Sequence, residues 1–208
     1  MQDLVRRGYL PGSGLLSPQG VFYLNIPKNA STYLSNMLLS NGWQHHTLGD
    51  SSHLIQQCIV VLRDPVDRWV SGFATYASSW LLGPNYGSDH FVEDYNALTE
   101  RVIFDNIVFD DHTTAQSRFV DQLPILMHTT YFELNKLTVK NISSYIGCDL
   151  NISTVDSNVS EDHYDQQQIS KFIRDRLTNR PDLIERINEQ YANDFNLIDS
   201  VQYYNDAR

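Results

Sequence analysis

One short apolar segment constrains the fold of this chain more than any other. Residues 57–62 read Gln-Cys-Ile-Val-Val-Leu, a run rich in β-branched residues that predicts a strand buried on both faces. Asp64 and Pro65 follow almost at once and are typical of a helix start, as cap residue and first helical position. A strand that leads directly into a helix is typical of an α/β fold, in which ligands bind at the carboxyl ends of parallel strands.

The alternation of strand and helix continues along the chain. The patterns predict further strands at 21–26, 43–48 and 125–132, and helices at 34–41, 92–104, 111–122, 134–146 and 181–198. Residues 8–20 are rich in Gly, Pro and Ser, which favours irregular structure. We expect one α/β domain over residues 1–208, with a central parallel sheet flanked by helices and an irregular N-terminal segment at 1–19.

Composition and charge narrow the function classes. The net charge of −10 disfavours nucleic acid and anionic membrane surfaces as partners. No apolar stretch reaches the roughly 18 residues of a membrane span, and no signal peptide is visible, so a soluble, cytoplasmic protein is expected. Two cysteines make no disulfide framework, and no Cys/His cluster has zinc-ligand spacing, so no metal is predicted.

A first polar motif follows the strand predicted at 21–26. It reads Pro27-Lys28-Asn29-Ala30-Ser31-Thr32 and leads into a helix, whose unpaired N–H groups favour an anion. Lys28 supplies a positive charge, Ser31 and Thr32 supply hydroxyl donors, and small Ala30 lets the backbone approach a ligand. The Walker A spacing is absent. An ordinary capped helix after a strand would account for the same residues.

A second motif follows the strand predicted at 57–62. Arg63 lies at the strand end and Ser71 about two turns into the next helix, a sensible clamp for a terminal phosphate. A local interpretation is that Asp64 caps the helix and Arg68 pairs with Asp64 at i+4. That interpretation leaves Arg63 and Ser71 unexplained.

Together the two motifs resemble the sulfotransferase superfamily, especially its carbohydrate-type, family 2-like branch. Residues 27–32 are similar to the family's 5′-phosphosulfate loop, Pro-Lys-x-Gly-x-Thr, with Ala30 in place of the glycine. Residues 63–73 are similar to its 3′-phosphate motif, Arg-Asp-Pro-x-x-Arg-x-x-Ser-x-Tyr, with Phe73 in place of the tyrosine. Weaker similarity continues at 111–116, 131–134 and 191–195. The likeness covers most of residues 20–198.

The resemblance implies a P-loop-like nucleotide-binding fold and an enzyme that moves a sulfuryl group from 3′-phosphoadenosine-5′-phosphosulfate (PAPS) to an acceptor hydroxyl. It implies that Lys28 contacts the 5′-phosphate and the bridging oxygen, and that Arg63 and Ser71 hold the 3′-phosphate. The remaining cofactor-binding residues implied are Pro27, Asn29, Ala30, Ser31 and Thr32. The acceptor implied is a carbohydrate or small molecule, and no metal is needed.

Such a reaction needs a base for the acceptor proton, and the family uses His or Glu. The candidates here, in order of preference, are His46, His112, His45 and His53. A surface or structural histidine is as good an interpretation of each one.

Two other functions stay open from the sequence. One is a nucleotide-dependent phosphotransferase, which the missing Walker A spacing disfavours. The other is a non-catalytic module that binds PAPS or adenosine bisphosphate and lacks a working base. Oligomeric state is not determined by any of these patterns.

Overall fold

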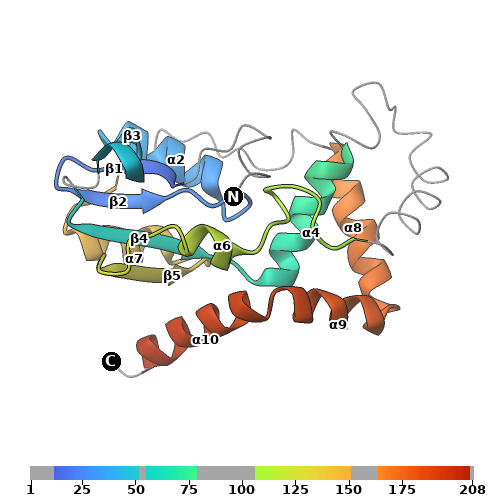
Figure 1. Ribbon diagram of the computed structural model, residues 1–208. Coiled ribbons are helices and arrows are strands. Elements are labelled where there is room, and N and C mark those ends of the chain that lie inside the picture. Colours follow the sequence, from blue (N-terminus) through green and yellow to red (C-terminus); the bar gives the residue numbers. More distant parts are fainter. Residues whose placement is uncertain (1–11, 52–54, 79–105, 151–163, 207–208) are drawn as a thin grey trace.

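The computed structural model describes residues 12–51, 55–78, 106–150 and 164–206 (Figure 1). The strands are β1 (Ser13–Leu16), β2 (Val21–Leu24), β3 (Gln44–Thr47), β4 (Gln57–Leu62) and β5 (Thr129–Glu133). The helices are α2 (Ser31–Ser40), α3 (Leu48–Ser51), α4 (Pro65–Tyr76), α6 (Gln116–Val120), α7 (Thr138–Ile146), α8 (Tyr164–Thr178), α9 (Pro181–Gln190) and α10 (Ala192–Asp206). The helix expected at 92–104 lies outside the described residues.

The fold is α/β, as expected, but its sheet is mixed. The strand order is β3-β1-β2-β4-β5. Strands β2, β4 and β5 run parallel, whereas β1 is antiparallel to both β2 and β3. The prediction of a purely parallel sheet is therefore wrong at the β1 side.

The exception comes from a hairpin inside the segment expected to be irregular. A tight turn at Ser17-Pro18-Gln19-Gly20 joins β1 to β2, and a connection this short can only join antiparallel strands. The Ser17 hydroxyl accepts from the backbone N–H of Val21 at 2.9 Å and stabilises the turn. The turn residues Pro and Gly were visible in the sequence, but the four-residue strand before them was too short to recognise.

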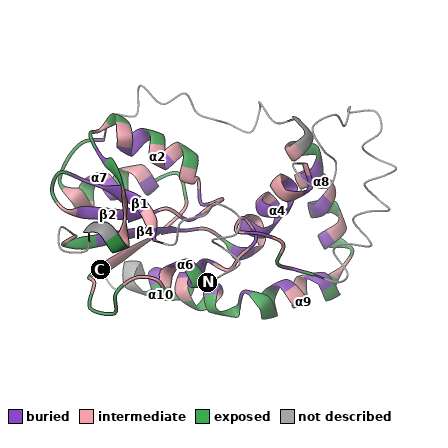
Figure 2. Cartoon of the chain, turned by 45° about the horizontal axis from the view of Figure 1, so that its top comes forward, coloured by how far each residue is buried: buried purple, intermediate pink, exposed green. Residues whose placement is uncertain are grey.

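The described residues form three apolar cores, two of which cover the faces of this sheet. Alternate residues of the central strands face α2 and α7 on one side, with Tyr23, Ile59 and Val61 in that core. On the other side Phe22 and Val60 face α6 and α10. A third core lies beyond the sheet, where α4 packs on α8 and α9 around Trp69 and Phe73 (Figure 1). Figure 2 shows β2 and β4 buried through the middle of the sheet.

Three other segments differ from the sequence expectation. Residues 110–115 form a turn ahead of the short helix α6, because the Asp110 and Thr113 side chains bond to nearby backbone N–H groups. The stripe expected to form one helix over 181–198 is divided at Tyr191, whose buried hydroxyl donates to the Thr113 carbonyl. Strand β5 starts only at Thr129, after an exposed turn.

Among the described residues we find no helix that is both long and apolar enough to cross a membrane.

Candidate functional site

The loop between β2 and α2 follows an uncommon backbone path. Lys28 and Ala30 have φ angles of 68° and 57°, in the left-handed region that residues other than glycine seldom occupy. Ala30 is the N-cap of α2 and contributes no side-chain cap, so the first N–H groups of the helix, from Ser31 onward, lack that partner. A helix start of this kind is suited to bind an anion.

The Lys28 side chain crosses from this loop to α4. Its Nζ donates to Thr75 Oγ1 at 2.7 Å. Burial lowers the pKa of Lys28, and the neighbouring guanidinium groups of Arg63 and Arg68 lower it further. An anionic ligand beside Nζ would offset both effects, because it restores favourable interactions to a partly desolvated cation.

Arg63 follows β4 and reaches the same loop. Its Nη1 donates to the Lys28 carbonyl at 3.0 Å. Burial lowers the pKa of Arg63, partly compensated by Asp67, and the nearby Arg174 lowers it again. Two motifs that are 35 residues apart in sequence are thus in direct hydrogen-bond contact.

Arg68 does not pair with Asp64 through its side chain. Asp64 is the N-cap of α4, as expected, and accepts from the Asp67 N–H at 2.8 Å. The Arg68 guanidinium is buried and donates to the carbonyls of Pro27, Asp111 and Thr114, at 3.0, 3.2 and 2.6 Å. Burial lowers the pKa of Arg68 to about 10. Arg68 therefore joins the Lys28 loop to the turn at 110–115.

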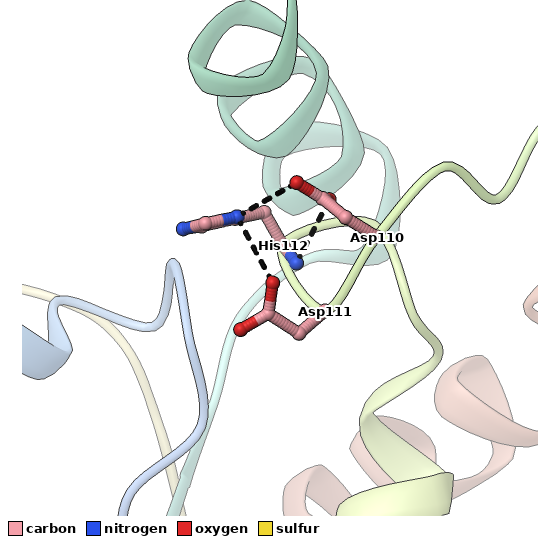
Figure 3. A group of neighbouring side chains, drawn as sticks. All are labelled: Asp110, Asp111 and His112. Carbon is pink, nitrogen blue, oxygen red and sulfur yellow. Dashed lines mark hydrogen bonds and ion pairs between the residues drawn. The ribbon is translucent and has the colours of Figure 1, made fainter. Parts of the chain in front are cut away.

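That turn presents His112 between two carboxylates (Figure 3). Its Nδ1 lies 3.0 Å from Asp110 Oδ2 and 3.2 Å from Asp111 Oδ1. Burial alone would lower the pKa of His112, but the hydrogen bonds to Asp110 and Asp111 outweigh it and raise the pKa to about 9. The other ring nitrogen points away from both carboxylates (Figure 3) and is the one left for proton exchange with a ligand.

The same three side chains form the candidate metal group among the described residues. Each offers one ligand atom, and these atoms lie within 4.8 Å of one another. The hydrogen bonds from His112 Nδ1 to both carboxylates account for the same geometry, since a shared proton holds the three groups together. The arrangement is thus explained without a metal ion.

Gly72 brings this turn close to α4. A Cβ built on Gly72 would lie 2.3 Å from the His112 carbonyl oxygen and 2.8 Å from its carbonyl carbon. Real Cβ atoms do not approach backbone so closely, so any side chain here would push His112 away. Ser71, its neighbour, lines the cavity described next.

These groups surround one open cavity of about 740 Å³. Among the described residues its lining includes four Lys or Arg side chains and a single carboxylate, although the chain carries a net charge of −10. The cationic residues are Lys28, Arg63, Lys171 and Arg174. The local excess of positive charge makes this cavity suited to an anion, within an acidic protein.

The structure gathers most of the residues that the sequence singled out. Those lining the cavity are Pro27, Lys28, Ala30, Ser31, Thr32, Arg63, Ser71 and His112. Asn29 is fully buried, and its amide bonds to protein groups behind the loop. His45 and His46 lie on β3, the edge strand on the other side of β1, and neither lines the described part of the cavity. His53 lies outside the described residues.

The sequence interpretation missed the far wall of the cavity, which belongs to α8. Gln167, Ser170, Lys171 and Arg174 share one helical face toward the cavity, at i, i+3, i+4 and i+7. Gln166 approaches Thr75 at 3.4 Å, and Arg174 pairs with Asp67 at 2.6 Å. The spacing was visible in the sequence, but only the packing of α8 on α4 shows that this face lines an open cavity.

Comparison with known proteins yields no match to a family model, a curated protein or a solved structure.

Proposed function

We propose that this chain binds PAPS in the cationic cavity and transfers its sulfuryl group to an acceptor hydroxyl. The observation that carries the proposal is the convergence of Lys28 and Arg63 on one cavity, at the carboxyl ends of adjacent parallel strands. Ligands of open α/β sheets bind at this edge. The resemblance of both motifs to the sulfotransferase superfamily supports the same assignment.

The 5′-phosphate of the donor would lie on the first N–H groups of α2 and the Ser31 and Thr32 hydroxyls. Lys28 Nζ would leave Thr75 for the oxygen that bridges sulfur and phosphorus. Negative charge grows on that oxygen as the S–O bond breaks, so a cation beside it lowers the barrier. Arg63 and Ser71 would hold the 3′-phosphate, a contact that simple adenosine nucleotides cannot make.

The acceptor oxygen attacks sulfur as the S–O bond to the 5′-phosphate breaks, and adenosine 3′,5′-bisphosphate leaves. The acceptor proton goes to His112, the described candidate histidine that lines the cavity. Asp110 and Asp111 hold its Nδ1 and stabilise the imidazolium that results. Glu133, at the end of β5, does not line the cavity.

The binding half of the proposal is tested by thermal shift with adenosine 3′,5′-bisphosphate, AMP and ATP. At a hundred times the dissociation constant a ligand stabilises by about 2.7 kcal/mol, which for a chain of this size is about 5–10 °C. We expect such a shift for the bisphosphate and much less for AMP. Equal shifts for all three nucleotides would contradict a 3′-phosphate clamp.

The catalytic half is tested by release of adenosine 3′,5′-bisphosphate from PAPS in the presence of simple carbohydrates and phenols. Binding without any release across the panel would favour a non-catalytic binding module. Magnesium-dependent turnover of ATP would favour a phosphotransferase instead.

A further inference from the structure

A buried glutamine connects the two proposed phosphate-binding motifs. Gln116 opens α6 and is 0% exposed. Its Oε1 accepts from Asn29 Nδ2 at 2.6 Å and from the Arg63 N–H at 2.9 Å. Its Nε2 donates to the Arg63 carbonyl at 2.8 Å. One side-chain amide therefore holds both backbone groups of Arg63 and the side chain of Asn29 in the Lys28 loop.

The backbone of Gln116 is itself held by α10, which packs with α6 on the same side of the sheet. Asp194, on α10, accepts the backbone N–H of Gln116 at 2.7 Å and that of Ser117 at 2.8 Å. Asp194 is 1% exposed, so these charge-assisted bonds are shielded from water. The backbone of Gln116 is thus anchored, and its side chain has little freedom to follow a shift of either motif.

Asn29 completes the connection. It is fully buried, and its Nδ2 donates to Gln116 and also to the Val61 carbonyl at 2.7 Å. Asn29 lies between the two left-handed residues Lys28 and Ala30, so its bonds help to hold the loop in this uncommon path. The positions of Lys28 and Arg63 relative to one another depend on these buried amides.

We infer that Gln116 is a positioning residue that sets the spacing between the two motifs, and with it the preference for a nucleotide phosphorylated at both ends. The inference rests on the proposed function. A ligand with two phosphates can engage both motifs only when their separation matches its own length, and a displaced motif that loses its charge-assisted hydrogen bonds lowers the affinity by about tenfold or more. AMP engages only the Lys28 loop, so its affinity depends far less on that separation.

The test is the ratio of two dissociation constants, for AMP and for adenosine 3′,5′-bisphosphate, measured by calorimetry at pH 7. Charge-assisted bonds to the 3′-phosphate should make this ratio at least about tenfold in the native chain. Gln116→Met keeps the length of the side chain and removes its three hydrogen bonds. We expect it to lower the ratio by about tenfold, mainly through weaker binding of the bisphosphate.

Two further variants make the result decisive. Gln122→Met is the matched control, because Gln122 follows the same helix, bonds only locally to the Arg118 carbonyl and does not line the cavity. It should leave the ratio unchanged. If Gln116→Met does not fold, Asn29→Ala cuts the same connection at its other end, and we expect the ratio to fall there too.

The outcomes separate the inference from the proposed function. A native chain that does not prefer the bisphosphate contradicts the proposed function, whatever the variants do. If Gln116→Met prefers the bisphosphate as strongly as the native chain does, the positioning role is wrong, even where the melting temperature falls. If Gln116→Met does not fold, the same result in Asn29→Ala has the same meaning. A merely structural role would lower stability and weaken both ligands equally, which leaves the ratio in place.

Discussion

Two histidine-bearing regions lie at the same end of the sheet and differ in almost every other respect. His46 pairs with Gly14, which pairs with Leu24, so His46 is level with the last residue of β2. Two strand spacings, about 10 Å, separate it from that strand end. His112 is on no strand, yet the turn at 110–115 brings it to the cavity beside Lys28 and Ser71.

The difference lies in what holds each ring. His112 is fixed by two carboxylates and by the close approach of its backbone to Gly72. His45 and His46 belong to an edge strand, with His45 exposed and His46 partly so. A position level with the strand end is therefore insufficient for a site, and the loops around the cavity decide which histidine can act.

The largest effect should come from a substitution in the cavity. Lys28→Ala removes the cation that we propose lies beside the leaving oxygen, and we expect sulfuryl transfer to fall about 10³-fold and the thermal shift with adenosine 3′,5′-bisphosphate to vanish. Lys136→Ala, at an exposed position after β5, is the control. An unchanged thermal shift in Lys28→Ala would remove the basis for placing the nucleotide here.

His112→Asn should lower turnover by about 10²-fold while the affinity for the bisphosphate stays near the native value. With a pKa of about 9 the native ring is mostly protonated at pH 7, so turnover should rise with pH and level off above about pH 9. Turnover of the His112→Asn variant should not show this rise with pH. Native turnover that falls through the same range would show that the charged ring, rather than the neutral base, is needed.

The same substitution has a stability consequence of known sign. Since the folded pKa of His112 lies above the unfolded value of 6.5, its contribution is fully present below pH 6.5 and disappears as pH rises through about 9. The free energy of unfolding of the native chain should exceed that of His112→Asn most at pH 6. Denaturant titrations of both proteins at pH 6 and pH 9.5 measure this difference in unfolding free energy, which should be large at pH 6 and small at pH 9.5.

Arg68→Met tests the buried hydrogen bonds that join the Lys28 loop to the turn at 110–115. It leaves three carbonyls of two loops without their donor, and we expect a loss of about 3 kcal/mol in unfolding free energy, a fall of about 6–12 °C in melting temperature. Arg186→Met, on α9, serves as the comparison for loss of an arginine. A fall no greater than in that control would mean that Arg68 does not hold the two loops together.

Ala30→Gly should have a smaller effect of the opposite sign. The φ of 57° at Ala30 favours glycine, so relief of the left-handed conformation should stabilise the chain by about 0.5–1 kcal/mol. Ala192→Gly, in the first turn of α10, should instead destabilise it. If both variants lose stability alike, the loop does not hold this backbone in solution.

The smallest effect should come from substitutions of the two histidines on β3. His46→Ala and His45→Ala should each change turnover by no more than about twofold, since neither side chain lines the cavity. If either variant loses as much turnover as His112→Asn, the general base lies on β3 and not in the turn at 110–115.

Prediction from the sequence succeeded where local pattern and local structure coincide. The apolar run of β4 and the cap and proline of α4 each signal their element through nearest neighbours. The break at Tyr191 and the face of α8 that lines the cavity depend on partners far along the chain, whereas the first strand of the local β1–β2 hairpin has only four residues and carries too little pattern to recognise. Periodicity has no access to distant partners, and for that reason the break at Tyr191 and the role of α8 were missed.

The amino-acid sequence by itself determined the α/β class, the strand-loop-helix units and the identity of two cationic motifs, because each is specified by side chains within a few residues of one another. Only the tertiary structure decided that Lys28 and Arg63 touch, that Asn29 faces the interior, and that His112 rather than His46 lies at the cavity. Those outcomes depend on buried hydrogen bonds from Arg68 and Gln116, whose acceptors and donors come from separate loops.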